Sequence, residues 1–382
     1  MSKTKAERGY LHEEDRYMDF LHYSFGFNGV NDTFPAMLPK VYKNRDSILS
    51  SWIVRDEDGY IVSAVGAFEN TINVCGTTLS AMGIGNVATH PRYRSKGYMK
   101  LCMQASLDEM IEKNTDLAFL GGRRHRYRNF GYEKCSSDLH FSVSQKIMSY
   151  FPNAQEPVLT MIEVKEDDQK VLDDIYAAHN ARPYHVTRER EKLFDIMSSW
   201  HSTVLAFYKD DSLIGWAVAQ KRDYISEIVI LDDKFAGNMI YQIVRRQGTQ
   251  KFIVPTFEKK TAAALQKYSE NFYFGCDACF MILNYEKVLR AALELKASVQ
   301  ELPDCSFVVR INGIKQVENL EISVKDGKTS VNSTEKTPDF EFSHLDAQEF
   351  LLLNYTPLRD SLPASVSAVL PLPLFMPHVD NV

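Results

Sequence analysis

The sequence predicts a mixed α/β protein made of three consecutive units. Apolar strand-like segments alternate with amphipathic helix-like segments over the first 150 residues, and the same order recurs up to residue 284. From residue 285 the pattern changes to one helix, several half-polar strands and a second helix. A chain of 382 residues is too long for one compact core. We therefore expect units at residues 1–150, 151–284 and 285–382.

The first unit opens with a helix and closes with strands. Apolar residues at helical spacing predict the helix, and a polar, glycine-ended turn at 55–59 predicts a hairpin. An apolar strand then leads directly into a long amphipathic helix. The predicted segments are a helix over 10–24, strands over 48–54, 60–68 and 82–88, a helix over 97–113, a strand over 117–120, a helical or turn segment over 124–129, and strands around Tyr132 and over 139–143.

The second unit repeats this order, and the third differs from both. The repeat lies in the order of elements and not in residue identity. Alternating apolar and polar residues in the third unit predict half-buried strands. The second unit has predicted helices over 170–178, 189–197, 237–246 and 259–268 and strands over 204–208, 213–220, 225–231 and 252–255; the third has helices over 286–297 and 346–353 and strands over 307–311, 320–324, 329–332 and 339–342.

The composition is that of a soluble globular protein, with 45% hydrophobic and 25% charged residues. A net charge of −6 argues against a general nucleic-acid binder, which carries a basic face. Residues 1–8 are polar and lack the apolar core of a secretory signal, and no run approaches the roughly 20 apolar residues of a membrane span. We expect a cytoplasmic protein with neither nucleic-acid nor membrane partners.

Six cysteines are scattered along the chain, which favours reduced thiols in a cytoplasmic protein. Cys276 and Cys279 have the spacing of a metal half-site or a redox pair, but no second pair and no nearby histidine accompany them. They precede the apolar segment 280–283, so we interpret them as packing residues at the edge of a strand. We expect no metal.

The most informative stretch is the passage from the apolar strand over 82–88 into the helix that opens near Gly97. The first N–H groups of a helix have no internal partner, and the helix dipole favours negative charge there. Arg94 and Lys96 add positive charge, and Gly97 permits close approach of a phosphate to the main chain. We predict a pyrophosphate site; the alternative is a solvated basic turn. His90, before Pro91, is expected to shape the turn and not to act as a base.

The segment Arg94-Ser95-Lys96-Gly97-Tyr98-Met99 resembles the R/Q-x-x-G-x-G/A pattern of the GNAT-superfamily N-acetyltransferases, with Met99 where that family usually has glycine or alanine. It follows a strand ending Val-Ala-Thr-His-Pro, which in that family is the splayed strand. The whole layout is similar to the Eis-type (enhanced intracellular survival) acetyltransferases. That resemblance implies two tandem GNAT-like mixed sheets with flanking helices and a C-terminal sterol-carrier-protein-like α/β domain.

The resemblance implies acetyl-CoA as the cosubstrate. It also implies a homo-oligomer. A backbone N–H near Val87 would polarise the thioester carbonyl. The cofactor-binding residues expected from the strand and the turn are Val87, Ala88, Arg94, Ser95, Lys96, Gly97, Tyr98 and Met99.

The resemblance also implies a general acid and a general base for the reaction. Tyr127 lies three residues before Phe130-Gly131-Tyr132, where the family has its general acid; without the pattern it would be interpreted as a core tyrosine. The family uses its C-terminal carboxylate as general base, which here belongs to Val382, although some members end in an aromatic residue. The apolar residues between 370 and 376 make an exposed tail unfavourable, at about 25 cal/mol per Å² of apolar area, so we expect the tail to dock.

The predicted function is acetyl-CoA-dependent N-acetylation of an amine by direct attack in a ternary complex. The acceptor is a polyamine-like or aminoglycoside-like small molecule, or a lysine side chain. Phe25, Phe27 and Phe34 are candidates for lining the amine pocket, with core packing as the alternative. Asp233 stands where the second unit would need a cation, so we predict one coenzyme A site per chain. The alternative function is non-catalytic binding of a lipid or another hydrophobic ligand.

Overall fold

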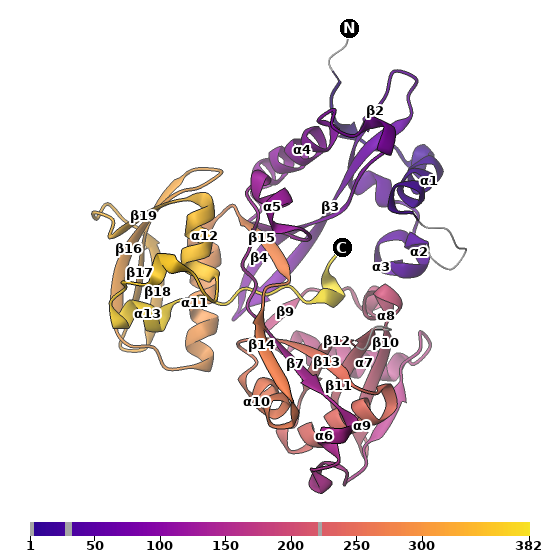
Figure 1. Cartoon of the computed structure of the whole chain (residues 1–382), viewed down its shortest axis with the longest axis vertical. Coiled ribbons are helices and arrows are strands. Elements are labelled where there is room, and N and C mark those ends of the chain that lie inside the picture. The colour runs from indigo at the N-terminus through magenta and orange to yellow at the C-terminus, as the bar shows by residue number, and fades with distance from the viewer. Residues whose placement is uncertain (1–3, 27–32, 221–223) are drawn as a thin grey trace.

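The computed structural model describes residues 4–26, 33–220 and 224–382. Within these residues the strands form three sheets, each accompanied by helices, so the fold is mixed α/β as the sequence predicts. The first and second sheets follow one another along the long axis of the molecule, and the third packs beside their junction (Figure 1). None of the helices among the described residues is long and apolar enough to span a membrane.

The first sheet has the order β1-β2-β3-β4-β5-β15-β6, with β9 paired to β3. Its elements are β1 (Glu7–Arg8), β2 (Ser51–Arg55), β3 (Ile61–Val74), β4 (Thr77–Thr89), β5 (Leu117–Gly121), β6 (Glu133–Lys134), β9 (Tyr184–Val186) and β15 (Ala278–Ile282), with α1 (Glu14–Phe25), α2 (Phe34–Met37), α3 (Pro39–Tyr42), α4 (Tyr98–Glu112) and α5 (Arg124–Tyr127). Successive residues of β2 face opposite sides: Val54 packs with residues of α4, and Ile53 with residues of α1. The sheet is therefore covered on both faces.

The second sheet has the order β14-β7-β13-β12-β11-β10-β8. Its elements are β7 (Asp138–Val143), β8 (Thr160–Glu163), β10 (Thr203–Lys209), β11 (Ser212–Gln220), β12 (Tyr224–Ile230), β13 (Gln250–Pro255) and β14 (Asn271–Gly275), with α6 (Gln145–Met148), α7 (Gln169–Asn180), α8 (Leu193–Ser198), α9 (Ala236–Gln247) and α10 (Lys259–Tyr268). β12 runs parallel to β13, as β4 runs parallel to β5. This correspondence supports the internal repeat.

Two strands lie in sheets that the sequence analysis did not assign to them. β7 was predicted to close the first unit, but it pairs with β13 and β14 of the second sheet, so that assignment is wrong. β15 instead returns to the first sheet, where it lies between β5 and β6. Alternating polarity shows that a segment is a strand, but it does not show which sheet supplies its partners. The exchange ties the first two units together.

Two predicted elements also begin differently. Residues 48–50 were expected to be extended, but Ser47–Ser50 forms a 3-10 helix and β2 begins at Ser51. The predicted helix over 10–24 starts with a 3-10 turn, Leu11–Glu13, before α1. Terminal turns of this kind are common, and hydrophobic periodicity does not separate them from the element that follows.

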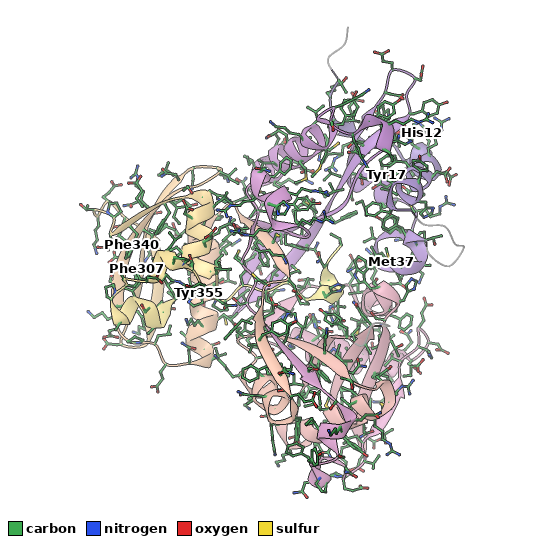
Figure 2. The ribbon with its side chains drawn as sticks, in the orientation of Figure 1. His12, Tyr17, Met37, Phe307, Phe340 and Tyr355 are labelled. Carbon is green, nitrogen blue, oxygen red and sulfur yellow. The ribbon has the colours of Figure 1, made fainter. Side chains whose placement is uncertain are left out.

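The third sheet has the order β18-β17-β16-β19. Its elements are β16 (Cys305–Asn312), β17 (Val317–Lys325), β18 (Lys328–Ser333) and β19 (Phe340–Ser343), with α11 (Tyr285–Val299), α12 (His344–Leu352) and α13 (Ala364–Val369). Phe307 and Phe340 meet edge to face, with ring centroids 6.3 Å apart (Figure 2). The apolar side chains of these strands and helices belong to a core that continues into the first sheet at Phe119 and Phe280.

From α13 the chain leaves the third unit and crosses to the junction of the first two (Figure 1). Leu370, Leu372 and Leu374 are buried in the core that joins the units, which confirms that the apolar tail docks. The Lys296 ammonium donates to the carbonyls of Val369 and Pro371 at 2.8 and 2.9 Å. The tail ends beside the first sheet.

Candidate active site

The site is built around the second half of β4. Within the described part of the chain, β4 pairs with β5 only at Ala81–Gly83, opposite Leu117–Phe119. Beyond Gly83 the two parallel strands separate. A strand that leaves its neighbour presents backbone N–H and C=O groups to a ligand. This separation exposes the backbone near Val87 and Ala88.

A bulge in β4 redirects the strand at this point. The register with β3 shifts after the pair Gly66–Gly85, and Asn86 adopts a positive φ of 54°. Asparagine tolerates this left-handed conformation better than most residues. Its amide donates to the hydroxyl of Tyr17 at 3.4 Å, and that hydroxyl also lies 2.8 Å from Ser51 Oγ. Tyr17 lies on α1 (Figure 2). Helix α1 thereby supports the bulge.

The turn after β4 ends at the N-terminus of α4. Gly97 is the N-cap residue, with φ of 81°, and the first intrahelical bond runs from the Leu101 N–H to its carbonyl. Gly97 has no side chain that could cap the helix, so the N–H groups of the first turn stay available to an anion. The adjoining cavity has a volume of about 620 Å³. The predicted residues that line it are Val87, Ala88, Arg94, Ser95, Gly97, Tyr98 and Met99.

Three residues of this region differ in role. Lys96 does not line the cavity; its ammonium lies 4.8 Å from the centre of the Tyr93 ring. Met99 is half-buried and also packs against the core under α4. His90 accepts a hydrogen bond from the Arg92 N–H at 3.3 Å, which confirms that it shapes the turn.

The corresponding turn of the second unit differs in charge. Asp232 caps it by accepting a hydrogen bond from the Lys234 N–H at 3.0 Å. Asp233 forms an ion pair with Lys260 at 2.9 Å. Asp232 and Asp233 thus place negative charge in the turn before α9, where the first unit has Arg94 and Lys96.

The C-terminal residue of the chain lies beside β4, although about 300 residues separate the two in the sequence. A β-carbon on Gly85 would lie 3.1 Å from the carboxyl carbon of Val382, and one on Gly83 would lie 2.7 Å from Val382 Cγ2. A β-carbon on Gly121, the last residue of β5, would lie 3.2 Å from the Asn381 amide. Glycines on the two diverging strands therefore make room for the tail.

Val382 also lines a second cavity of about 670 Å³. Residues of β3 form one wall, and Thr187, Glu189 and Ile196 of the second unit form another. The cavity is strongly charged, with Glu69, Glu109, Glu189, Arg8 and Lys113 among its lining residues. The second unit therefore encloses the space in front of the chain terminus.

Tyr127 is buried at the end of α5, with 7% of its surface exposed. Burial raises the pKa of its phenol, and the nearby Arg126 opposes that rise. A β-carbon on Gly122 would lie only 2.4 Å from Tyr127 Cε2. Since Gly121 contacts the tail, the two adjacent glycines contact Asn381 and Tyr127 respectively. Tyr127 does not line the first cavity, but its neighbours Arg126 and Phe130 do.

The three phenylalanines predicted for the amine pocket are placed differently. Phe25 lines the first cavity, beside the turn. Phe34 is buried and packs against Phe25 and Tyr42, with ring centroids 5.1 Å apart in each case. Phe27 lies outside the described residues. The second cavity is lined by other side chains, Phe68 among them.

Lys40 and Arg188 hold the tail, and sequence reasoning missed both. The Lys40 ammonium donates to the carbonyls of Val379 and Asn381, and Arg188 pairs with Asp380. A lysine or arginine alone in the sequence gives no signal of this role. Burial of Arg188 and its partners is a property of the assembled fold.

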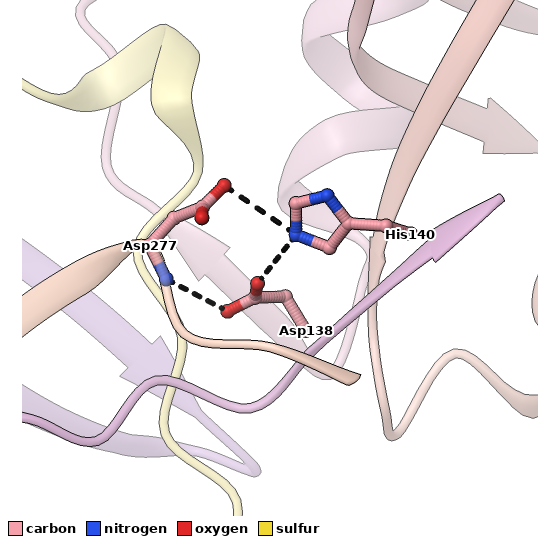
Figure 3. Close-up of side chains that lie close together, drawn as sticks. All are labelled: Asp138, His140 and Asp277. Atoms are coloured by element: carbon pink, nitrogen blue, oxygen red, sulfur yellow. Dashed lines mark hydrogen bonds and ion pairs between the residues drawn. The ribbon is translucent and has the colours of Figure 1, made fainter. Parts of the chain in front are cut away.

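Two cysteines and one cluster of acidic residues and a histidine lie near the junction of the first two sheets. Cys276 and Cys279 are free, and burial raises their pKa values to about 12 and about 11, which agrees with packing residues. Beside Cys276, the His140 imidazole lies 2.8 Å from Asp138 and 3.5 Å from Asp277 (Figure 3). Asp138 also accepts a hydrogen bond from Ser136. This hydrogen-bonded group joins β7 to the segment that returns to the first sheet.

Comparisons with known proteins bear on the first unit and on the overall fold. Residues 9–135 match the family described as the acetyltransferase (GNAT) domain. No curated protein matches the chain.

Several solved structures share the fold of the whole chain. A GCN5-related N-acetyltransferase from Anabaena variabilis is 14% identical, with all of both chains covered and a TM-score of 0.69. Eis1 from Mycobacterium abscessus is 12% identical, with 97% of each chain covered and a TM-score of 0.67. A probable N-acyltransferase from Enterococcus faecalis is 17% identical, with 91% of this chain and 88% of that chain covered and a TM-score of 0.65.

Proposed function

We propose that this chain, whose residues 9–135 form a GNAT acetyltransferase domain, transfers the acetyl group of acetyl-CoA to an amine by direct attack in a ternary complex. The observation that carries the proposal is the position of β4. Its far end opens into the anion-binding turn of the first cavity, and the chain terminus lies on its middle, in the second cavity.

Each step of the proposed reaction is assigned to a group of this chain. The turn from Arg94 to Met99 holds the pyrophosphate, and a backbone N–H near Val87 stabilises negative charge on the carbonyl oxygen. The amine enters from the second cavity. Its ammonium form, with a pKa of about 10.4 for a lysine-type amine, loses a proton to the Val382 carboxylate directly or through water. The nitrogen then attacks the thioester carbon, and the C–S bond breaks.

Tyr127 donates its phenolic proton to the departing thiolate. Its raised pKa keeps that proton in place at neutral pH. The attacking nitrogen still carries one proton more than the amide product, and this proton passes to the Tyr127 phenolate and restores the phenol, while the proton on Val382 leaves to solvent.

The acceptor is a cationic amine such as a polyamine, an aminoglycoside or a lysine side chain, because the Val382 carboxylate in the second cavity attracts its ammonium form. The other charges of this cavity are mixed, since Glu109 pairs with Arg8 and Lys113 and Glu189 pairs with Lys192. Asp232 and Asp233 put negative charge in the corresponding turn of the second unit, where it would repel a phosphate, and this supports a single coenzyme A site.

Calorimetry with coenzyme A tests the cradle, which is the anion-binding turn from Arg94 to Met99. Arg94→Ala combined with Gly97→Asp removes one cation, strains a residue at positive φ and adds a repelling carboxylate, so affinity should fall by at least about tenfold. Lys234→Ala in the second unit is the matched control and should bind as the wild type does. Unchanged affinity in the double variant would show that the cradle is misassigned.

A thiol-release assay with spermine, kanamycin and Nα-acetyl-lysine amide tests the transfer itself. Deletion of Asn381 and Val382 should lower turnover strongly while acetyl-CoA still binds. Turnover that survives the deletion would remove the terminal carboxylate from the mechanism, and binding of coenzyme A without turnover of any amine would contradict the enzyme as proposed.

A further inference from the structure

We infer that Lys40 and Arg188 are positioning residues, which hold residues 379–381 so that the Val382 carboxylate lies against β4 in the second cavity. The inference rests on the proposed function, in which this carboxylate takes the proton of the amine. It assigns a role to two basic side chains from different units, neither of which touches the cradle.

Arg188 is the inner anchor. It follows β9, is 1% exposed, and uses its guanidinium in two directions. Nε and one terminal nitrogen donate to the two oxygens of Asp380 at 2.9 and 2.8 Å. The terminal nitrogens also donate to the two oxygens of Glu227 at 3.2 and 2.8 Å. Bidentate geometry on both sides fixes the direction of Asp380 as well as its position.

Glu227 holds Arg188 in turn. It lies on β12, is buried, and also accepts a hydrogen bond from the Trp216 indole at 3.1 Å. Burial alone would raise the pKa of Glu227, but the charge and hydrogen bonds of Arg188 outweigh it and lower the pKa to about 2. The second sheet thus supplies a rigid support for the anchor.

Lys40 is the outer anchor. It lies on the short helix α3 of the first unit, and its ammonium donates to the carbonyls of Val379 and Asn381, at 2.6 Å each. These two carbonyls flank Asp380. Three consecutive residues are therefore fixed, alternately through carbonyl, side chain and carbonyl, by groups from two units.

The positions of these contacts explain why they matter for the reaction. The last residues of a chain are usually frayed unless something ties them down. Here the last anchored carbonyl belongs to Asn381, next to Val382, and the glycines at 83 and 85 leave little spare room. A displacement of about 1 Å in a catalytic group can lower a rate by about 100-fold. The two anchors limit this displacement.

The rate at which carboxypeptidase Y releases Val382 measures how firmly the end of the chain is held, without any assumption about catalysis. Lys40→Met should release Val382 at least about tenfold faster than the wild type, because two charge-assisted hydrogen bonds to the tail are lost. Lys40→Arg keeps a cationic donor and should restore much of the protection. Lys43→Met is the matched control, since Lys43 is in the same segment but pairs with Glu166 and Asp195 instead.

Asp380→Asn tests the inner anchor without leaving Arg188 unpaired, because Glu227 remains. It keeps the shape of the side chain and removes its charge, so tail release should again accelerate. Arg188→Lys keeps the charge but loses the bidentate geometry and should fall between the wild type and Asp380→Asn. Circular dichroism and the melting temperature identify any variant that fails to fold.

Turnover with whichever of the three amine probes reacts completes the test. Lys40→Met and Asp380→Asn should lower kcat by between about 10- and 100-fold, with KM for acetyl-CoA unchanged. Release of Val382 at the wild-type rate in both variants would overturn the inference. Faster release with an unchanged kcat would overturn the proposed general base and, with it, the catalytic purpose of the anchors, while the anchors themselves would stand.

Discussion

Gly85 faces Val382, although one lies in the middle of β4 and the other ends the chain. A β-carbon on Gly85 would lie 3.1 Å from the carboxyl carbon of Val382 and 3.3 Å from its oxygen. Gly85 does not have a positive φ, so its importance comes from the absence of a side chain and not from backbone conformation. The bulge at Asn86 follows directly. The carboxylate therefore lies where β4 leaves β5.

Gly85→Ala should displace the terminal carboxylate by a few tenths of an ångström or more. We expect kcat to fall by about tenfold and coenzyme A affinity to stay unchanged, since the cradle lies beyond the bulge. Steady-state kinetics and calorimetry measure these two quantities. The same substitution in a chain lacking residues 381 and 382 should have no further effect, and an additive loss would mean that Gly85 acts independently of the tail.

Tyr127 should act as the acid through its hydroxyl and its position. Tyr127→Phe removes the hydroxyl, and Gly122→Ala pushes the ring with a β-carbon 2.4 Å from Cε2; each should lower kcat by about 100-fold. Because burial raises the pKa of Tyr127, the wild type should lose activity through this group only at a pH above the range in which an exposed tyrosine titrates. Tyr132→Phe is the matched control, since the Tyr132 hydroxyl has no hydrogen-bond partner among the described residues. Equal activity of Tyr127→Phe and the control would remove the acid assignment.

Acid should weaken the inner anchor. The pKa of Glu227 is about 2 in the folded chain and near 4.5 when unfolded, so its contribution is complete above pH 4.5 and is lost as the pH falls towards 2. Glu227→Gln should destabilise the protein by about 3–5 kcal/mol at pH 7. The difference from the wild type in urea unfolding should narrow below pH 4.5. Glu335→Gln, an exposed control, should change the free energy of unfolding neither at pH 7 nor below pH 4.5. A difference in unfolding free energy between wild type and Glu227→Gln that stays constant down to pH 3 would contradict the ion pair.

Alkali should weaken the outer anchor. Burial lowers the pKa of Lys40 to about 7; the charge of Asp380 opposes this shift, and that of Arg188 adds to it. Another titratable group beside Lys40 is His378, whose pKa burial lowers to about 4, so it stays neutral near pH 7. Protonated Lys40 holds the tail more strongly than neutral Lys40.

The ratio of wild-type kcat to Lys40→Met kcat should therefore fall as the pH rises through about 7, because only the wild type has this ammonium to lose. The ratio cancels the deprotonation of the amine, which is common to both proteins. The stability of the folded protein should change with pH in the opposite direction to this ratio. A lysine with a lowered pKa opposes folding most below pH 7, and this penalty disappears as the pH rises towards 10.5. A ratio independent of pH from 6 to 9 would contradict the role of the ammonium.

Hydrophobic periodicity was sufficient for most elements of the first two units, because each helix or strand buries one face locally. It failed at residues 48–50, where a 3-10 turn precedes β2, and at β7, which pairs with the second sheet. The cradle could be predicted because its parts are consecutive in the chain. Lys40 and Arg188 could not be, since their partners lie 339 to 341 and 192 residues away.

The sequence by itself determined the local chemistry: a strand, a cationic turn and a helix N-terminus at residues 82–99, a tyrosine in a recognisable setting, and an apolar tail that must be buried. These follow from backbone geometry and hydrophobicity over short stretches. Only the tertiary structure decided where the tail ends. Distant segments are joined by the exchange of β7 and β15 between the sheets and by the anchors Lys40 and Arg188. Contacts between segments so far apart in the chain produce no periodic pattern of residues, so the sequence does not reveal them. The position of the Val382 carboxylate on β4 is a property of the assembled chain.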